Sequence, residues 1–348
     1  MTSLRPLLAA TLLLLVSAGC ASRVVRAEGP LRGGLLRRGA PTMGGVFVWS
    51  DEVVFHDYRI QKHAVIGHYR LLDPGNNRLT FGSFADCMSE LEKIKAEKNL
   101  GPMPENVVVM LHGLGAGRQY MQGLADYLQT EGGMTVVNVG YPSTMGKMED
   151  YAASLDSVIR HLEGTKNISF VAHSMGNIVV RKYLYDVEHL TPAMRPPVTF
   201  QRMVMISPPN HGAEIADKLG DNKLVQMAAG EPVEELARDK GWPALEETLA
   251  TPDFEFGVIA GGRGDDEGYL PGIPGDDDAL LSIDTMKLAG ASDFVQTGGI
   301  HQLMARYKVV RAATLAFLQN GYFVTPESKQ PILENPELPA AVPAVAPQ

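Results

Sequence analysis

Short apolar runs recur through the middle of the chain, and amphipathic helical patterns separate them. The runs are continuous and rich in β-branched residues, as strands covered on both faces should be; they occupy residues 107–111, 135–139, 168–171, 203–206 and 256–260. Between the second and third runs, the apolar residues of 148–162 share one helical face. Strands and helices in alternation predict an α/β fold with a doubly wound, mostly parallel sheet. Such a sheet binds its ligand at the carboxyl ends of its strands.

A different pattern, of short β-rich runs separated by turn residues, precedes these elements. It predicts a small antiparallel, β-rich extension over 45–104, packed on a main domain that spans 105–324. The extension's three histidines lack the tight spacing of metal ligands, so we expect no metal site there. Within the main domain, 213–250 is helical in pattern and is either a small cap over the site or a packed excursion.

The two ends of the chain have biased compositions. Residues 1–19 read as a signal peptide, because Arg5 is followed by an apolar stretch of ten residues, too short to span a membrane. This stretch runs into Val16-Ser17-Ala18-Gly19-Cys20, which resembles the lipobox of bacterial lipoproteins and implies a lipid on Cys20. An ordinary secretory signal is the alternative. Residues 20–44 then form an Arg/Gly-rich tether, and 325–348 a Pro/Ala-rich tail predicted to be disordered.

The composition is that of a globular protein, with 45% apolar and 20% charged residues, and the net charge is −9. Residues 1–40 carry six Arg against Glu28, so the remainder has a net charge of −14. An acidic body excludes a nucleic-acid binder, since nothing would neutralise phosphates. We therefore expect an exported protein of the cell envelope, anchored to the membrane through Cys20, or else secreted or periplasmic. With Cys20 lipidated, Cys87 has no disulfide partner and is expected to be a small buried hydrophobe.

The third predicted strand runs into Ala172-His173-Ser174-Met175-Gly176, and a helix is expected directly after it. A turn this tight from strand to helix needs small residues at its first and last positions and strains the backbone of its central residue. The strain exposes the Ser174 hydroxyl above the sheet, at a helix N-terminus that favours negative charge. We therefore predict Ser174 as a nucleophile.

A Gly-rich turn, His112-Gly113-Leu114-Gly115-Ala116-Gly117, follows the first predicted strand. It has neither a Lys at Walker spacing nor a GxGxxG pattern, which disfavours a phosphate cradle. The better interpretation is an oxyanion hole, formed by the backbone N–H groups of Leu114 and Met175. In this setting His112 is expected to be a structural hydrogen-bonding residue and not a base.

Residues 108–117 and 171–176 together resemble the α/β-hydrolase superfamily, and specifically its lipase-like bacterial members. These proteins commonly pair an HG-x-G turn with a [GA]-H-S-M-G elbow. The resemblance covers roughly residues 105–320 and implies a Ser, acid, His triad in that chain order. His301 is the one histidine downstream of residue 211 and becomes the predicted base. His211 is the minor alternative, because it precedes any plausible acid.

The acid is predicted from the loop that begins at Gly275, which resembles the family's N-D-G-x-V-x-V loop with Ala279 in place of its Gly. Aligning the apolar positions assigns the acid to Asp278. Asp277 and Asp276 stay open, within one or two residues of slippage. The alternative is that these three aspartates form a solvated acidic loop or a cation site.

The expected activity is that of a serine hydrolase of the lipase/esterase type, which cleaves small-molecule or lipid esters through an acyl-enzyme. No cofactor, metal or nucleic-acid partner is expected. A thioesterase, an amidase or an acyltransferase would use the same triad, because specificity depends on pocket shape. A non-catalytic envelope lipoprotein that uses the scaffold for binding is the alternative from another class.

Overall fold

The structure of the protein is a computed structural model. It describes residues 40–41, 48–214, 216 and 230–338. The predicted signal peptide and Cys20 lie outside the described residues, as do most of the predicted tether and the end of the tail. Among the helices of the described part, none has the length and apolar character that would be needed to cross a membrane.

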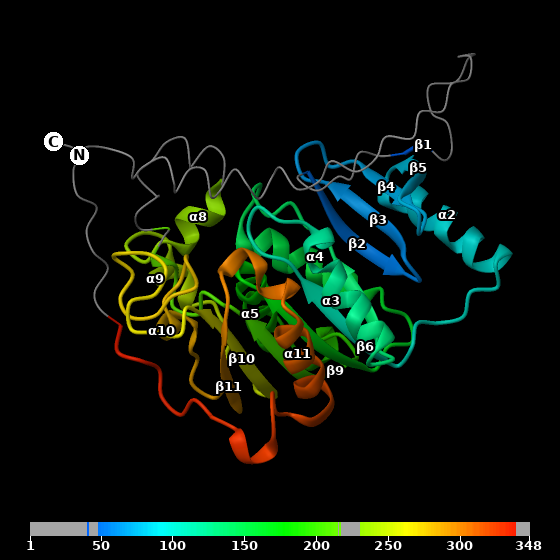
Figure 1. The fold of residues 1–348 in the computed structure, drawn as a ribbon. Helices are drawn as coiled ribbons and strands as arrows, with labels where there is room; N and C mark the ends of the chain where they lie inside the picture. The colour runs from blue at the N-terminus through cyan, green and yellow to red at the C-terminus, as the bar shows by residue number, and fades with distance from the viewer. Residues whose placement is uncertain (1–39, 42–47, 215, 217–229, 339–348) are drawn as a thin grey trace, which may run out of the picture.

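The main sheet has six strands, all parallel, in the order β11-β10-β9-β8-β6-β7 (Figure 1). In chain order they are β6 (Asn106–Leu111), β7 (Thr135–Val139), β8 (Asn167–His173), β9 (Thr199–Ile206), β10 (Glu255–Gly262) and β11 (Asp293–Gly298). The predicted doubly wound parallel sheet is therefore confirmed. The strand order reverses at β6, which pairs with both β7 and β8, so a crevice is expected at the carboxyl ends of β6 and β8.

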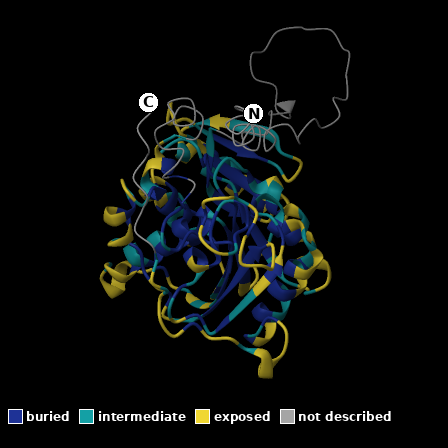
Figure 2. Ribbon diagram, turned by 60° about the vertical axis from the view of Figure 1, so that its left-hand side comes forward, coloured by how far each residue is buried: buried dark blue, intermediate teal, exposed yellow. Residues whose placement is uncertain are grey.

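Helices cover both faces of this sheet; the long ones are α3 (Arg118–Thr130), α4 (Met148–Arg160), α5 (Met175–Glu188) and α11 (Lys308–Asn320). Val107 and Val109 of β6 belong to the core cluster that contains α4 and α5, whereas Val108 and Met110 belong to the one that contains α3 and α11. This division explains why the strand sequences are continuously apolar, since both faces of each strand are covered. Figure 2 shows the buried layer between the helices.

The N-terminal extension is an antiparallel sheet in the order β1-β5-β4-β3-β2. An antiparallel unit was predicted over 45–104, but β1 lies within residues 20–44, which were predicted to be a tether, and it pairs with β5. The strands of this sheet are β1 (Ala40–Pro41), β2 (Trp49–Phe55), β3 (Tyr58–His63), β4 (Tyr69–Leu72) and β5 (Asn77–Gly82). A helix, α2 (Phe84–Glu97), follows and was not predicted. Its signal is a capping box, in which Ser83 and Asp86 satisfy each other's backbone N–H groups.

Shorter helices complete the described structure: η1 (Pro192–Met194), α8 (Glu231–Leu236), α9 (Trp242–Glu246), α10 (Ile283–Met286), η2 (His301–Arg306) and η3 (Pro326–Ser328). α8 and α9 belong to the segment predicted as a cap or packed excursion. Val233, Leu236, Trp242 and Leu245 of these helices are buried in the main core, and residues 217–229 of the segment lie outside the described residues.

The first part of the predicted tail requires a correction, because it is bound to the main domain. The Ile332 N–H donates to the Ala291 carbonyl (2.9 Å), and the Ile332 carbonyl accepts from the Gly290 N–H (2.8 Å). The Ile332 side chain is buried, and the Gln330 N–H donates to the Asp293 carboxylate. Because proline has no backbone N–H, a Pro-rich segment cannot pair as a regular β-strand, but a single apolar residue can still bind an extended segment to the domain.

Candidate active site

Ser174 occupies the sharp turn between β8 and α5, with φ 54° and ψ −130°. This is a conformation that non-glycine residues adopt only when the surrounding structure enforces it. A Cβ at Gly176 would lie 2.6 Å from the His112 carbonyl oxygen, so α5 passes β6 at a distance that only glycine permits. A strained serine in a tight strand-to-helix turn, at the carboxyl edge of a doubly wound parallel sheet, decides the architecture. This is the α/β-hydrolase fold.

The α/β-hydrolase sheet brings the three residues of the predicted triad together, although 127 residues separate Ser174 from His301. The His301 Nε2 lies 2.7 Å from the Ser174 Oγ, and its Nδ1 lies 2.7 Å from the Asp278 Oδ2. The carboxylate of Asp278 is fully buried, and its Oδ1 accepts from the N–H groups of Leu280 and Leu281. A buried carboxylate held in this way fixes the tautomer and orientation of the imidazole.

The other two candidates for the acid face different groups. Asp277 is buried and accepts from the N–H groups of Leu270 and Ala279, and burial raises its pKa. Asp276 accepts from the N–H groups of Arg263 and Gly264. Of the three consecutive carboxylates, Asp278 is therefore the one that contacts His301. The loop turns at Ala279, whose φ of 75° occupies the position where the family's loop has glycine.

His173 is a further site residue, which the sequence analysis did not single out. Its Nε2–H donates to the His301 carbonyl oxygen (2.9 Å), so it fixes the backbone of the predicted base. Burial, followed by the nearby His301, lowers the pKa of His173 well below its ordinary value, and the ring is therefore neutral. The signal was present in the sequence, because His173 directly precedes Ser174 and is carried by the same strand.

The Gly-rich turn after β6 abuts the elbow. A Cβ at Gly113 would lie 2.8 Å from the Ser174 Cβ, so this contact also requires glycine. The Leu114 N–H has no backbone acceptor among the described residues, and the Met175 N–H is in the first turn of α5, where a helix provides none. Neither predicted oxyanion donor therefore has a backbone acceptor among the described residues; Leu114 follows Gly113, and Met175 follows Ser174.

The direction of the Leu114 N–H follows from the contacts of the Gly113 carbonyl. This carbonyl accepts from the Nδ1–H of His112 (2.9 Å) and from the Ala116 N–H (3.3 Å), and in a trans peptide the N–H points opposite to the C=O. His112 is fully buried and its ring stacks on that of Tyr141, with centroids 4.3 Å apart. Burial lowers the pKa of His112 to about 4, so the ring stays neutral and acts as a structural donor.

The alternative base, His211, contacts a different carboxylate. Its Nδ1 lies 3.6 Å from the Glu246 Oε1, and burial lowers the pKa of His211.

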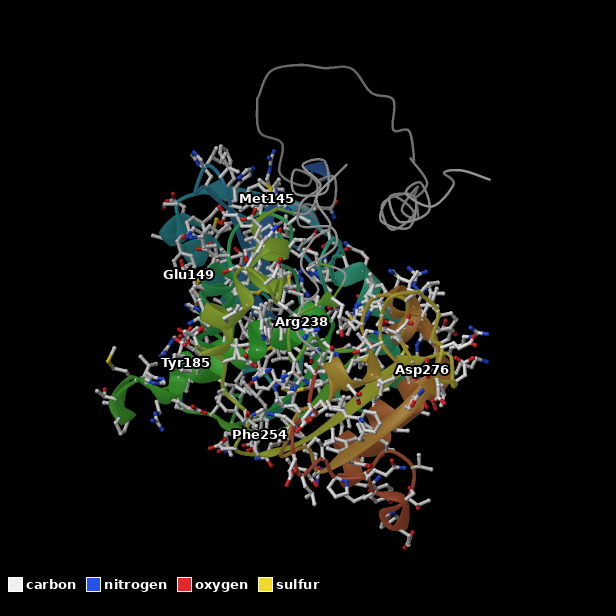
Figure 3. All side chains as sticks on the ribbon, turned by 90° about the vertical axis from the view of Figure 1, so that its left-hand side faces the viewer. Met145, Glu149, Tyr185, Arg238, Phe254 and Asp276 are labelled. Atoms are coloured by element: carbon white, nitrogen blue, oxygen red, sulfur yellow. The ribbon has the colours of Figure 1, made fainter. Side chains whose placement is uncertain are left out.

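In the ranges that the structure describes, no three His, Cys, Asp or Glu side chains are grouped so as to hold a metal ion. In Figure 3, Met145, in the loop after β7, lies near the top, and Phe254, before β10, lies near the bottom.

No family model and no curated protein matches this sequence. Among solved structures, the chain is similar to the mature lipase BlEst2 of Bacillus licheniformis, with a TM-score of 0.45, 17% identity, and 63% of this chain and 92% of that one covered. The chain is also similar to a gene product of Listeria innocua, with a TM-score of 0.44 and 18% identity; 66% of this chain and 97% of that one are covered. For the phospholipase PlaB of Legionella pneumophila, the TM-score is 0.43 and the identity 17%; 62% of this chain and 56% of that one are covered.

Proposed function

We propose that this chain is a serine hydrolase that cleaves carboxylic esters through an acyl-enzyme. The observation that carries the proposal is the continuous hydrogen-bonded series Asp278, His301, Ser174, with both links at 2.7 Å, at a strained elbow. A nucleophile, a base and a residue that orients the base, in mutual contact, form the arrangement that activates a serine.

In the proposed reaction, His301 accepts the Ser174 proton as the Oγ attacks the acyl carbon. The N–H groups of Leu114 and Met175 donate to the oxyanion of the tetrahedral intermediate. His301 then protonates the leaving alcohol, which breaks the ester bond and leaves the acyl group on Ser174. Water, deprotonated by His301, releases the acid by the same steps.

The proposed substrates are small-molecule or lipid esters, and the proposed location is the cell envelope. The motif pair of a Gly-rich turn and a Ser174 elbow, as in lipase-like proteins, supports the first. The lipobox-like sequence at Cys20 supports the second. Metabolic labelling with an alkyne fatty acid tests the anchor: the full chain should be labelled and Cys20→Ser should not.

A fluorescent fluorophosphonate, applied to purified protein that lacks residues 1–20, tests the nucleophile. We expect labelling of the wild type and none of Ser174→Ala. Ser207→Ala is the matched control, because Ser207 is a buried serine with positive φ at the end of the neighbouring strand, and its hydroxyl has no partner among the described residues. A p-nitrophenyl ester series from acetyl to palmitoyl then defines the acyl length. A folded wild-type protein that is not labelled would refute the proposal.

A further inference from the structure

The N-terminal sheet contacts the residue that directly follows β7 through a buried carboxylate. The Asp51 N–H donates to the Gly140 carbonyl (2.8 Å), and the Asp51 Oδ2 accepts from the Gly140 N–H (2.7 Å). β2 thus binds both backbone polar groups of the residue that directly follows β7.

The Asp51 carboxylate is itself held in place by the next strands of its sheet. Asp51 is fully buried; the Arg59 Nη1 donates to its Oδ2 (2.5 Å), and the Gln61 Nε2 donates to its Oδ1 (2.7 Å). Arg70, on β4, in turn donates to the Gln61 side-chain oxygen. A charge buried among this many fixed donors has one orientation, so Gly140 is held against a rigid support.

From Gly140 the contacts continue into the oxyanion turn. Tyr141, the next residue, is fully buried; its ring stacks on His112, and its O–H donates to the His112 carbonyl. The Gly113 carbonyl accepts from the His112 Nδ1–H and from the Ala116 N–H (3.3 Å), and these two contacts set the direction of the Leu114 N–H. Tyr141 therefore contacts one of the two groups that orient the proposed donor.

We infer that Asp51 is a positioning residue for the reaction, acting through Gly140, Tyr141 and His112 to hold the Leu114 N–H at the place where the oxyanion forms. The N-terminal sheet is then a working part of the active site and not an appended domain. The inference rests on the proposed function.

The test compares Asp51→Asn and Tyr141→Phe with the wild type. Tyr141→Phe keeps the stacked ring and removes only the O–H, so it carries the test if Asp51→Asn fails to fold. Rates of p-nitrophenyl butyrate hydrolysis are expressed per active site titrated with the fluorophosphonate, which removes the effect of any unfolded fraction. Affinity for a trifluoromethyl ketone reports the oxyanion hole directly, because this inhibitor forms a tetrahedral adduct on the serine.

We expect kcat per titrated site and the affinity for the ketone to fall together, by about 10- to 100-fold, with KM within about threefold. Glu52→Gln is the matched control: Glu52 neighbours Asp51 on β2 but accepts from Ser154 on α4, and both readouts should stay within about twofold. Unchanged readouts in Tyr141→Phe, or equal losses in Glu52→Gln, would overturn the inference. A wild type without labelling at Ser174 would instead overturn the proposed function, and this inference with it.

Discussion

Gly113 offers the sharpest test of how closely the Gly-rich turn after β6, the proposed oxyanion hole, must approach Ser174. In Gly113→Ala the new Cβ would lie 2.8 Å from the Ser174 Cβ and 3.2 Å from the His173 Nδ1. An ordinary contact for such atoms begins at about 3.4 Å, so the turn and the elbow must separate by about 0.6 Å. Gly113 does not have a positive φ, so the substitution changes this contact and leaves the backbone preference alone.

The expected loss follows from that displacement. A misplacement of about 1 Å in a catalytic group costs about 100-fold in rate, so about 0.6 Å corresponds to a decrease of about 10- to 20-fold in kcat. Overpacking of this size also lowers the free energy of unfolding by about 1–3 kcal/mol, which leaves the protein folded at assay temperature if its stability is ordinary. KM should change little, because the turn contacts the developing oxyanion more than the bound ester.

Steady-state hydrolysis of p-nitrophenyl esters by wild type and variant, with thermal unfolding measured in parallel, provides the assay. Gly298→Ala is the control, since Gly298 lies at the end of β11 near His301 but a Cβ there would meet nothing within 4 Å. The reasoning would be refuted by a folded Gly113→Ala with kcat within twofold of the wild type, or by a Gly298→Ala that lost as much activity.

Three further predictions follow from the site and the core. Asp278→Asn should lower kcat by about 10⁴-fold while Asp276→Asn stays within about tenfold, measured on the same esters; equal losses would contradict the assignment of the acid. Burial lowers the pKa of His112 to about 4, so the unfolded chain takes up this proton first as pH falls below about 6.5. The free energy of unfolding should therefore drop by about 2 kcal/mol from pH 7 to pH 5 on account of His112, and urea titrations of His112→Asn should show a smaller drop than the wild type. Burial raises the pKa of the Cys87 thiol to about 11, so in protein lacking residues 1–20 it should react with a disulfide reagent at pH 8 only after denaturation; rapid reaction of the native protein would show that the thiol is accessible.

The sequence was sufficient for the architecture because the strands of the main sheet are covered on both faces. Val107, Val108 and Val109 pack alternately on opposite layers, and this makes the strand continuously apolar and easy to recognise. The elbow was equally readable, because the small residue at Gly176 is required by a contact with the neighbouring strand. Both signals are local, within a few residues along the chain.

Features that depend on contacts between residues distant in the sequence could not be predicted from it. Three consecutive aspartates have the same chemistry, and only the fold shows that Asp278 meets His301. Asp51 looks like an ordinary polar strand residue, since Gly140 lies 89 positions away. Ile332 is one apolar residue in a Pro-rich tail, and its hydrogen bonds to Gly290 and Ala291 have no sequence pattern.

The backbone of Ser174 has a consequence for stability that is separate from catalysis. At most positions an alanine makes a protein more stable than a glycine does, because glycine leaves the unfolded chain more conformational freedom. At φ 54° the order should reverse, since a side chain there costs about 1–3 kcal/mol of strain that glycine avoids. Ser174→Gly should therefore unfold at a higher urea concentration than Ser174→Ala, although both lack the nucleophile. The residue proposed as the nucleophile thus stands where the fold would be more stable without any side chain.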